Sequence, residues 1–188
     1  MSNRTANYTA FYVAEPFDPS NLNAYATKDF VYYNMIRAWK GKDSSFPFVD
    51  AHEKTYSVRD SSDWETTLKP RLHERLRASK NIILILSSLT ANSRALREEI
   101  TYGICVCELP VIVVYPEYEE KSDIAYPSGG IKQSIQRLWD RLPAFRDNMD
   151  SIPTCHIPMN KDLLKKCLKD DRFMVNTKGN PGAYCFLI

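Results

Sequence analysis

Two short apolar runs without alternation constrain the fold of this chain more than any other feature. They are NIILILSS at residues 81–88 and PVIVVYPE at residues 110–117. A strand with one face in water alternates apolar and polar residues, whereas a strand covered on both faces reads as a continuous apolar run. Both runs therefore predict central strands of a parallel sheet with helices packed on each face.

Weaker strand signals and helix-period segments alternate along the rest of the chain. This pattern predicts the α/β class: one doubly wound, flavodoxin-like domain, whose parallel five-stranded central sheet is flanked by helices on both faces. Without a repeat or low-complexity linker, we expect this domain over residues 1–150 and a strand/helix extension packed on it over 151–188. The remaining strands are predicted at 8–14, 46–50 and 152–157, and helices at 23–40, 62–76, 94–107, 130–141 and 161–168.

Composition excludes several classes of partner and compartment. The 188 residues carry a net charge of only +2, and no basic stripe follows any segment, so nucleic acid is not expected as a partner. The amino terminus lacks the apolar core of a signal peptide, and no run is long enough to span a membrane. The five cysteines form no CxxC pair, which is typical of reduced thiols and predicts a cytoplasmic protein.

Several familiar sites are missing from the sequence. GxGxxG is absent after the first strand, so a dinucleotide held as in a Rossmann cofactor site is not expected. GxxxxGK[ST] and GxSxG are absent too, which excludes a P-loop and a hydrolase nucleophile elbow. His52, His73 and His156 are isolated and lack metal-ligand spacing, so no metal site is predicted.

Two adjacent glutamates in the segment RALREEITYGI differ in their predicted environment. On a helix, Leu96, Ile100 and Gly103 form the buried face, and Glu98 points away from it. Glu99 falls at the edge of that face and leans toward the interior. Such a glutamate is either a rim residue paired with a basic neighbour or a functional carboxylate, and geometry alone leaves both readings open.

Ligands of open α/β sheets bind in the loops beyond the carboxyl ends of the strands. The helix that carries Glu99 begins at one of these loops, so Glu99 could reach a ligand there. Asp50 follows a predicted strand and could contact a ligand or cap its own turn. The residues predicted to contact a substrate, chosen because they lie in strand-end loops, are Phe17, Asp50, His52, Ser88 and Asn92.

The segment ILILSSLTANSRALREEI resembles the third strand, loop and helix of the TIR-like domain family, and within it the TIR proteins of Thoeris antiphage systems. The family pattern is an apolar strand followed by T-x-x-S-x-W-V-x-x-E-I, and the likeness extends over roughly residues 8–117. One position departs from the pattern, because alanine replaces the usual tryptophan. The matching positions in this chain are Thr90, Ser93, Ala95, Leu96, Glu99 and Ile100.

The resemblance implies a specific activity. Catalytic TIR domains break the bond between nicotinamide and ribose in NAD, and the essential carboxylate of that family aligns with Glu99. NAD would then be a substrate, and no cofactor is expected. In Thoeris-like members the ribosyl cation is captured internally, and the resulting cyclic ADP-ribose isomer signals to a partner effector protein. TIR enzymes also commonly assemble with copies of themselves.

Three other functions fit parts of the sequence. Many TIR-like domains are scaffolds that only bind other TIR surfaces, although a scaffold has no need of an inward glutamate. A nucleoside deoxyribosyltransferase-like enzyme also uses a glutamate in a flavodoxin-like sheet, but it would exchange free bases and ignore NAD. A receiver-type signalling domain would place aspartates at the end of the first strand, where this chain reads VAEPF.

Overall fold

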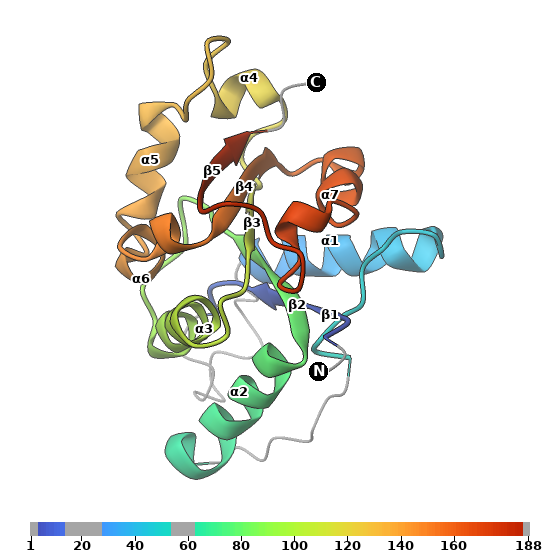
Figure 1. Cartoon of the computed structure of the whole chain (residues 1–188), viewed down its shortest axis with the longest axis vertical. Coiled ribbons are helices and arrows are strands. Elements are labelled where there is room, and N and C mark those ends of the chain that lie inside the picture. The colour runs from blue at the N-terminus through green and yellow to red at the C-terminus, as the bar shows by residue number, and fades with distance from the viewer. Residues whose placement is uncertain (1–3, 14–27, 54–62, 186–188) are drawn as a thin grey trace.

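The computed structural model describes residues 4–13, 28–53 and 63–185 of the chain. Five strands form one parallel sheet in the order β1-β2-β3-β4-β5 (Figure 1). The two continuous apolar runs supply its central strands, as the sequence predicts. The strands are β1 (Ala6–Ala10), β2 (Ser79–Ile85), β3 (Val111–Tyr115), β4 (Pro153–Pro158) and β5 (Gly182–Cys185).

Helices cover both faces of the sheet, and alternate residues of β2 belong to different cores. Ile82 and Leu84 pack in the cluster under α2, α3, α5 and α6, while Ile83 and Ile85 pack in the cluster under α1 and α7 (Figure 1). The predicted doubly wound α/β fold is therefore confirmed. The helices are α1 (Lys28–Lys42), α2 (Lys69–Arg77), α3 (Arg94–Cys105), α4 (Lys121–Ile124), α5 (Gln133–Trp139), α6 (Pro143–Arg146) and α7 (Lys161–Cys167).

The strand predicted at 46–50 is wrong, because the segment forms only an isolated parallel bridge between Asp50 and Asn7. Phe46 and Phe48 are buried as a strand would bury them, but Pro47 between them has no N–H to donate to a ladder. One backbone donor of the segment is bound by a side chain: the Val49 N–H donates to Asn7 Oδ1 at 2.8 Å. The segment therefore lies along the edge of β1 without becoming a strand.

The fifth strand of the sheet is instead β5, which sequence analysis did not predict. Its four residues pair with β4 in parallel from Gly182 to Cys185, and they are only partly buried. Such a short edge strand after the turn-forming sequence KGNPG gives too weak a signal. β4 and β5 belong to the same sheet as the first three strands, and α7 packs on one face of that sheet.

Other predicted boundaries shift by a few residues. β1 begins and ends earlier than the predicted 8–14, and α5 is shorter than the predicted 130–141. The helix predicted at 23–40 corresponds to α1, and residues 23–27 lie outside the described part. The helix predicted at 62–76 is a π-helical turn (Trp64–Leu68) followed by α2, with Pro70 in the first turn of α2.

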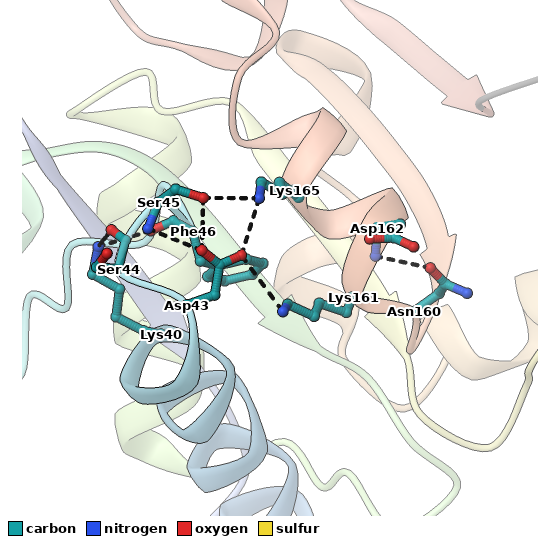
Figure 2. A network of polar contacts seen from close by, with 9 residues as sticks. All are labelled: Lys40, Asp43, Ser44, Ser45, Phe46, Asn160, Lys161, Asp162 and Lys165. Carbon is teal, nitrogen blue, oxygen red and sulfur yellow. Dashed lines mark hydrogen bonds and ion pairs between the residues drawn. The ribbon is translucent and has the colours of Figure 1, made fainter.

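A polar network joins the end of α1 to α7 on one face of the sheet (Figure 2). Lys165 Nζ lies 3.0 Å and Lys161 Nζ 3.5 Å from Asp43 Oδ2. Ser45 donates from its hydroxyl to Asp43 Oδ1 at 2.6 Å. Asp43 thus links two helices that are distant in sequence.

In the described part of the chain, no helix is both long and apolar enough to cross a membrane.

Candidate active site

Glu99 lies on α3, and the position of that helix follows from its sequence. Ser93 caps its first turn, accepting from the Leu96 N–H at 3.3 Å. One turn after Glu99, Gly103 faces the sheet so closely that a Cβ there would lie 2.4 Å from Ile82 Cδ1. The glycine therefore lets α3 approach the sheet, and Glu99 lies at the partly buried edge of the same face.

A hydrogen-bond donor to Glu99 comes from β1. Tyr8 donates from its hydroxyl to Glu99 Oε1 at 2.9 Å, across 91 residues of sequence. The tyrosine is 1% exposed and pairs in register with Ile82 of β2. A buried phenol requires a hydrogen-bond partner, and here the partner is the carboxylate itself.

His52 and Arg75 complete this group of side chains. The His52 ring centroid lies 4.7 Å from that of Tyr8. Its Nε2 is 3.0 Å from the Thr9 carbonyl oxygen, and its Nδ1 is 3.3 Å from Arg75 Nη1. Because a carbonyl only accepts and a guanidinium only donates, Nε2 carries the hydrogen and Nδ1 is bare. Burial also lowers the pKa of His52, so the ring is a neutral, fixed support.

Burial has a large effect on the protonation of Glu99. Loss of water around the carboxyl group raises its pKa to about 8, against the opposing effects of the Tyr8 hydroxyl and of the Arg75 charge. The pKa of Tyr8 is raised well above its ordinary value, chiefly by burial and also by the charge of Glu99. A carboxyl group with a pKa shifted toward neutrality, hydrogen-bonded to a hydroxyl and affected by a nearby positive charge, is typical of functional sites.

Glu98 has a different environment, as the predicted helix geometry requires. Its Oε1 lies 2.8 Å from His73 Nε2 and 3.7 Å from Lys69 Nζ. The His73 ring stacks on Tyr102 with centroids 3.5 Å apart. Glu98 thus takes part in an ion-pair cluster between α2 and α3, while Glu99 faces β1.

A second buried carboxylate holds the loop that leads from β2 into α3. Asp29, in the first turn of α1, is fully buried. It accepts hydrogen bonds from Ser87 Oγ at 2.7 Å and Thr90 Oγ1 at 3.1 Å. These contacts join the start of α1 to the carboxyl end of β2, which is the edge of the sheet where ligands of this fold class bind.

The predicted substrate contacts are distributed unevenly around Glu99. Asp50 accepts from the Tyr33 hydroxyl at 2.7 Å and from the His52 N–H at 2.9 Å, so it belongs to the group around His52. Ser88 instead contacts Glu117 through its N–H and its hydroxyl. Asn92 is exposed on the loop before α3. Phe17 lies outside the described residues, and the substrate contacts remain predictions.

Sequence reasoning missed Tyr8, Arg75 and Asp29. Tyr8 looked like an ordinary strand aromatic, and nothing in its local sequence shows that its hydroxyl reaches a residue on α3. Arg75 lies within KPRLHERLR, where it reads as one of several solvated charges. The sequence indicates the position of Arg75 only by placing it beside Leu72 and Leu76, at the edge of the apolar face of the helix.

The remaining histidine is part of a buried hydrogen-bonded chain. Trp139 donates to the Tyr115 hydroxyl at 2.8 Å, and Tyr115 lies 2.7 Å from His156 Nδ1. Nε2 of the same ring lies 3.0 Å from Thr154 Oγ1. Burial lowers the pKa of His156 to about 3.

Among the described residues, no cluster of three His, Cys, Asp or Glu side chains could hold a metal ion.

Comparison with known protein families identifies the chain. The family model described as the TIR-like domain of the Thoeris protein ThsB matches residues 8–121, which is more than half of the sequence. The chain belongs to the ThsB TIR-like family. The matched region includes the end of β1 from Tyr8 onward and all of α2, β2 and α3. It therefore contains Tyr8, Arg75 and Glu99, and it confirms the resemblance seen in the sequence.

Proposed function

We propose that this ThsB-family chain is an NAD-consuming enzyme of antiphage defence that cleaves the bond between nicotinamide and ribose. Its product would be a cyclic ADP-ribose isomer, a second messenger that activates a partner effector protein. The observation that carries the proposal is the partly buried Glu99, which accepts from Tyr8 and lies near Arg75 in a member of this family. The five free cysteine thiols fit a cytoplasmic location.

A single carboxylate is sufficient for this reaction. The electron pair of the ribosyl C1′–nitrogen bond leaves with nicotinamide, which is cationic in NAD and becomes neutral without taking up a proton. Positive charge develops on the ribose, and the ionised Glu99 would stabilise it. A nucleophilic atom of the same ADP-ribose unit then bonds to C1′ and releases its proton. Ordinary glycosidases need a second carboxylic acid, because their leaving group must be protonated.

Partial burial of Glu99 suits a cationic substrate. A pKa of about 8 means that the carboxyl group is largely protonated in the free protein near neutral pH. A nicotinamide cation placed beside it favours the ionised form and lowers its pKa. The ionised carboxylate would thus form when NAD occupies the site. In this arrangement the interaction between Glu99 and the charge on the ribose takes place with little screening by water.

The test is nicotinamide release from NAD by the wild type, Glu99→Gln and Glu98→Gln. The purified chain is assayed alone and with lysate from phage-infected cells, in case the resting enzyme is off. Release by the wild type and Glu98→Gln, lost in Glu99→Gln, supports the proposal. Glu98→Gln is the matched control, because it changes the neighbouring carboxylate on the same helix. If the wild type releases no nicotinamide under either condition, the chain is a TIR-like interaction scaffold.

A further inference from the structure

The hydroxyl group of Tyr8 has a role that its buried position alone does not require. We infer, on the basis of the proposed function, that Tyr8 is a positioning residue that occupies Oε1 of Glu99 and leaves Oε2 available to the substrate. The observation is the hydrogen bond of 2.9 Å between the two side chains. One oxygen of the carboxylate is thus used by the protein, and the other is the one that would face the developing charge on the ribose.

The Tyr8 ring is held by the sheet and by the ring of His52. Its backbone is part of β1, which pairs with β2 along its whole length. The His52 ring lies against it, tilted by 56°. His52 is itself fixed, since its Nε2–H donates to the Thr9 carbonyl oxygen and its Nδ1 accepts from Arg75. The phenol therefore reaches Glu99 from a rigid support, as a positioning group must.

A phenylalanine would fill almost the same volume as Tyr8, so packing does not explain the hydroxyl. Placing a phenol at 1% exposure costs free energy unless its O–H finds an acceptor. The acceptor here is the one carboxylate that the proposed reaction requires. A carboxylate on a helix has several rotamers available to it, and a donor fixed on the sheet selects one of them.

The same hydrogen bond also opposes the effect of burial on Glu99. A donor to the carboxylate favours the ionised form, as does the positive charge of Arg75 from α2. The groups that face Glu99 are therefore Tyr8 from β1 and Arg75 from α2, with the neutral His52 ring behind Tyr8. Without the Tyr8 hydroxyl, the charge of Arg75 is what remains, among the described residues, to offset desolvation.

The experiment compares Tyr8→Phe with Tyr33→Phe. Tyr33 is a matched control, because its hydroxyl donates to Asp50 at 2.7 Å. Carbon NMR of the Glu99 carboxyl group gives its pKa without any need for activity. We expect this pKa to rise by about 1 unit in Tyr8→Phe and to stay within about 0.3 of the wild-type value in Tyr33→Phe. An unchanged pKa in Tyr8→Phe overturns the inference even if activity falls.

Kinetics add a readout that a purely structural role would not produce. For Tyr8→Phe we expect kcat/KM for NAD to fall about tenfold at neutral pH, and the loss to shrink at higher pH, where Glu99 is ionised in both proteins. A fall that is equal at every pH overturns the inference. If the Glu99 pKa shifts while the wild type releases no nicotinamide, the contact is supported and the proposed function fails.

A reciprocal measurement covers the case in which Tyr8→Phe does not fold. The ζ-carbon of Tyr8 in the wild type should show an inflection near pH 8, at the pKa of Glu99, well below the titration of the phenol itself. Glu99→Gln should abolish that inflection. A Tyr8 signal that does not respond to the ionisation of Glu99 overturns the inference.

Discussion

Arg75 on α2 lowers the pKa of Glu99 on α3, while its Nη1 contacts the bare Nδ1 of His52 at 3.3 Å. One guanidinium group thus contributes to the site in two ways. It supplies positive charge near the carboxylate, and it fixes the ring that packs against Tyr8. The electrostatic role can be tested with variants that keep or remove the positive charge.

Replacement of Arg75 tests the electrostatic role. Arg75→Gln keeps an N–H donor but removes the charge, so we expect the pKa of Glu99 to rise further above about 8. At neutral pH, kcat/KM for NAD should fall by about threefold to tenfold, and the pH profile should move to higher pH. Arg75→Lys, which keeps the charge, should lose less. Identical pH profiles for Arg75→Gln and the wild type would contradict this prediction.

The pH dependence of the proposed reaction should follow the ionisation of Glu99. If the ionised carboxylate is the active form, kcat/KM should increase about tenfold per pH unit and level off above about pH 8. The apparent pKa in kcat should be lower, because in the proposed function the nicotinamide cation of bound NAD would lie near Glu99. Initial rates measured between about pH 5.5 and pH 9.5 check both statements. Glu98→Gln should leave the profile unchanged, and a flat profile rules out control by Glu99.

Stability should also respond to the protonation of Glu99. Its folded-state pKa of about 8 lies above the ordinary value of 4.5, so the folded protein holds the proton more tightly than the unfolded chain. The resulting stabilisation is complete below the unfolded pKa and is lost as the pH rises through about 8. Glu99→Gln removes this dependence. Above pH 8 the variant should be more stable than the wild type by about 1–3 kcal/mol.

Urea unfolding of the two proteins at several pH values provides the measurement. Near pH 4.5 the wild type and Glu99→Gln should have almost the same free energy of unfolding, because both side chains are then neutral in the folded state. A variant that is less stable than the wild type at high pH would show that ionised Glu99 contributes favourably to the fold. That result would conflict with the direction of its pKa shift.

Asp29 should be important for stability rather than for the bond-breaking step. Asp29→Ala leaves the Ser87 and Thr90 hydroxyls without their shared acceptor in a buried site, which should cost about 2–4 kcal/mol of unfolding free energy. Asp29→Asn retains an amide oxygen as an acceptor and should cost less. Denaturant unfolding with an unchanged m-value is the readout. A loss below about 0.5 kcal/mol for Asp29→Ala would contradict the role of this contact.

The parts of the fold that sequence predicts best are those in which one physical signal dominates. β2 and β3 are buried on both faces, so their apolar runs leave little ambiguity. The segment at 46–50 misleads because Phe46 and Phe48 are buried as in a strand, while Pro47 prevents ladder pairing. β5 is too short and too exposed to produce a pattern. Its place depends on tertiary pairing with β4.

Only the part of the candidate site that lies on a regular helix could be predicted from the sequence. The position of Glu99 at the edge of an apolar face can be read from α3 alone, and the difference from Glu98 is confirmed by their separate partners. Tyr8 and Arg75 lie 91 and 24 residues from Glu99 in sequence, and no local rule connects them. Their roles follow from the three-dimensional approach of β1, α2 and α3.

Asn7 immediately precedes Tyr8, and its side chain binds both neighbours of β1. Its Oδ1 accepts from the Val49 N–H at 2.8 Å, and its Nδ2 donates to Asn81 Oδ1 on β2 at 2.8 Å. A small lateral movement of β1 would carry the Tyr8 hydroxyl away from Glu99. On the proposed function, genetic screens for loss of phage resistance should therefore recover substitutions at this uncharged amide, which makes no hydrogen bond to the carboxylate, together with those at the acidic residue itself.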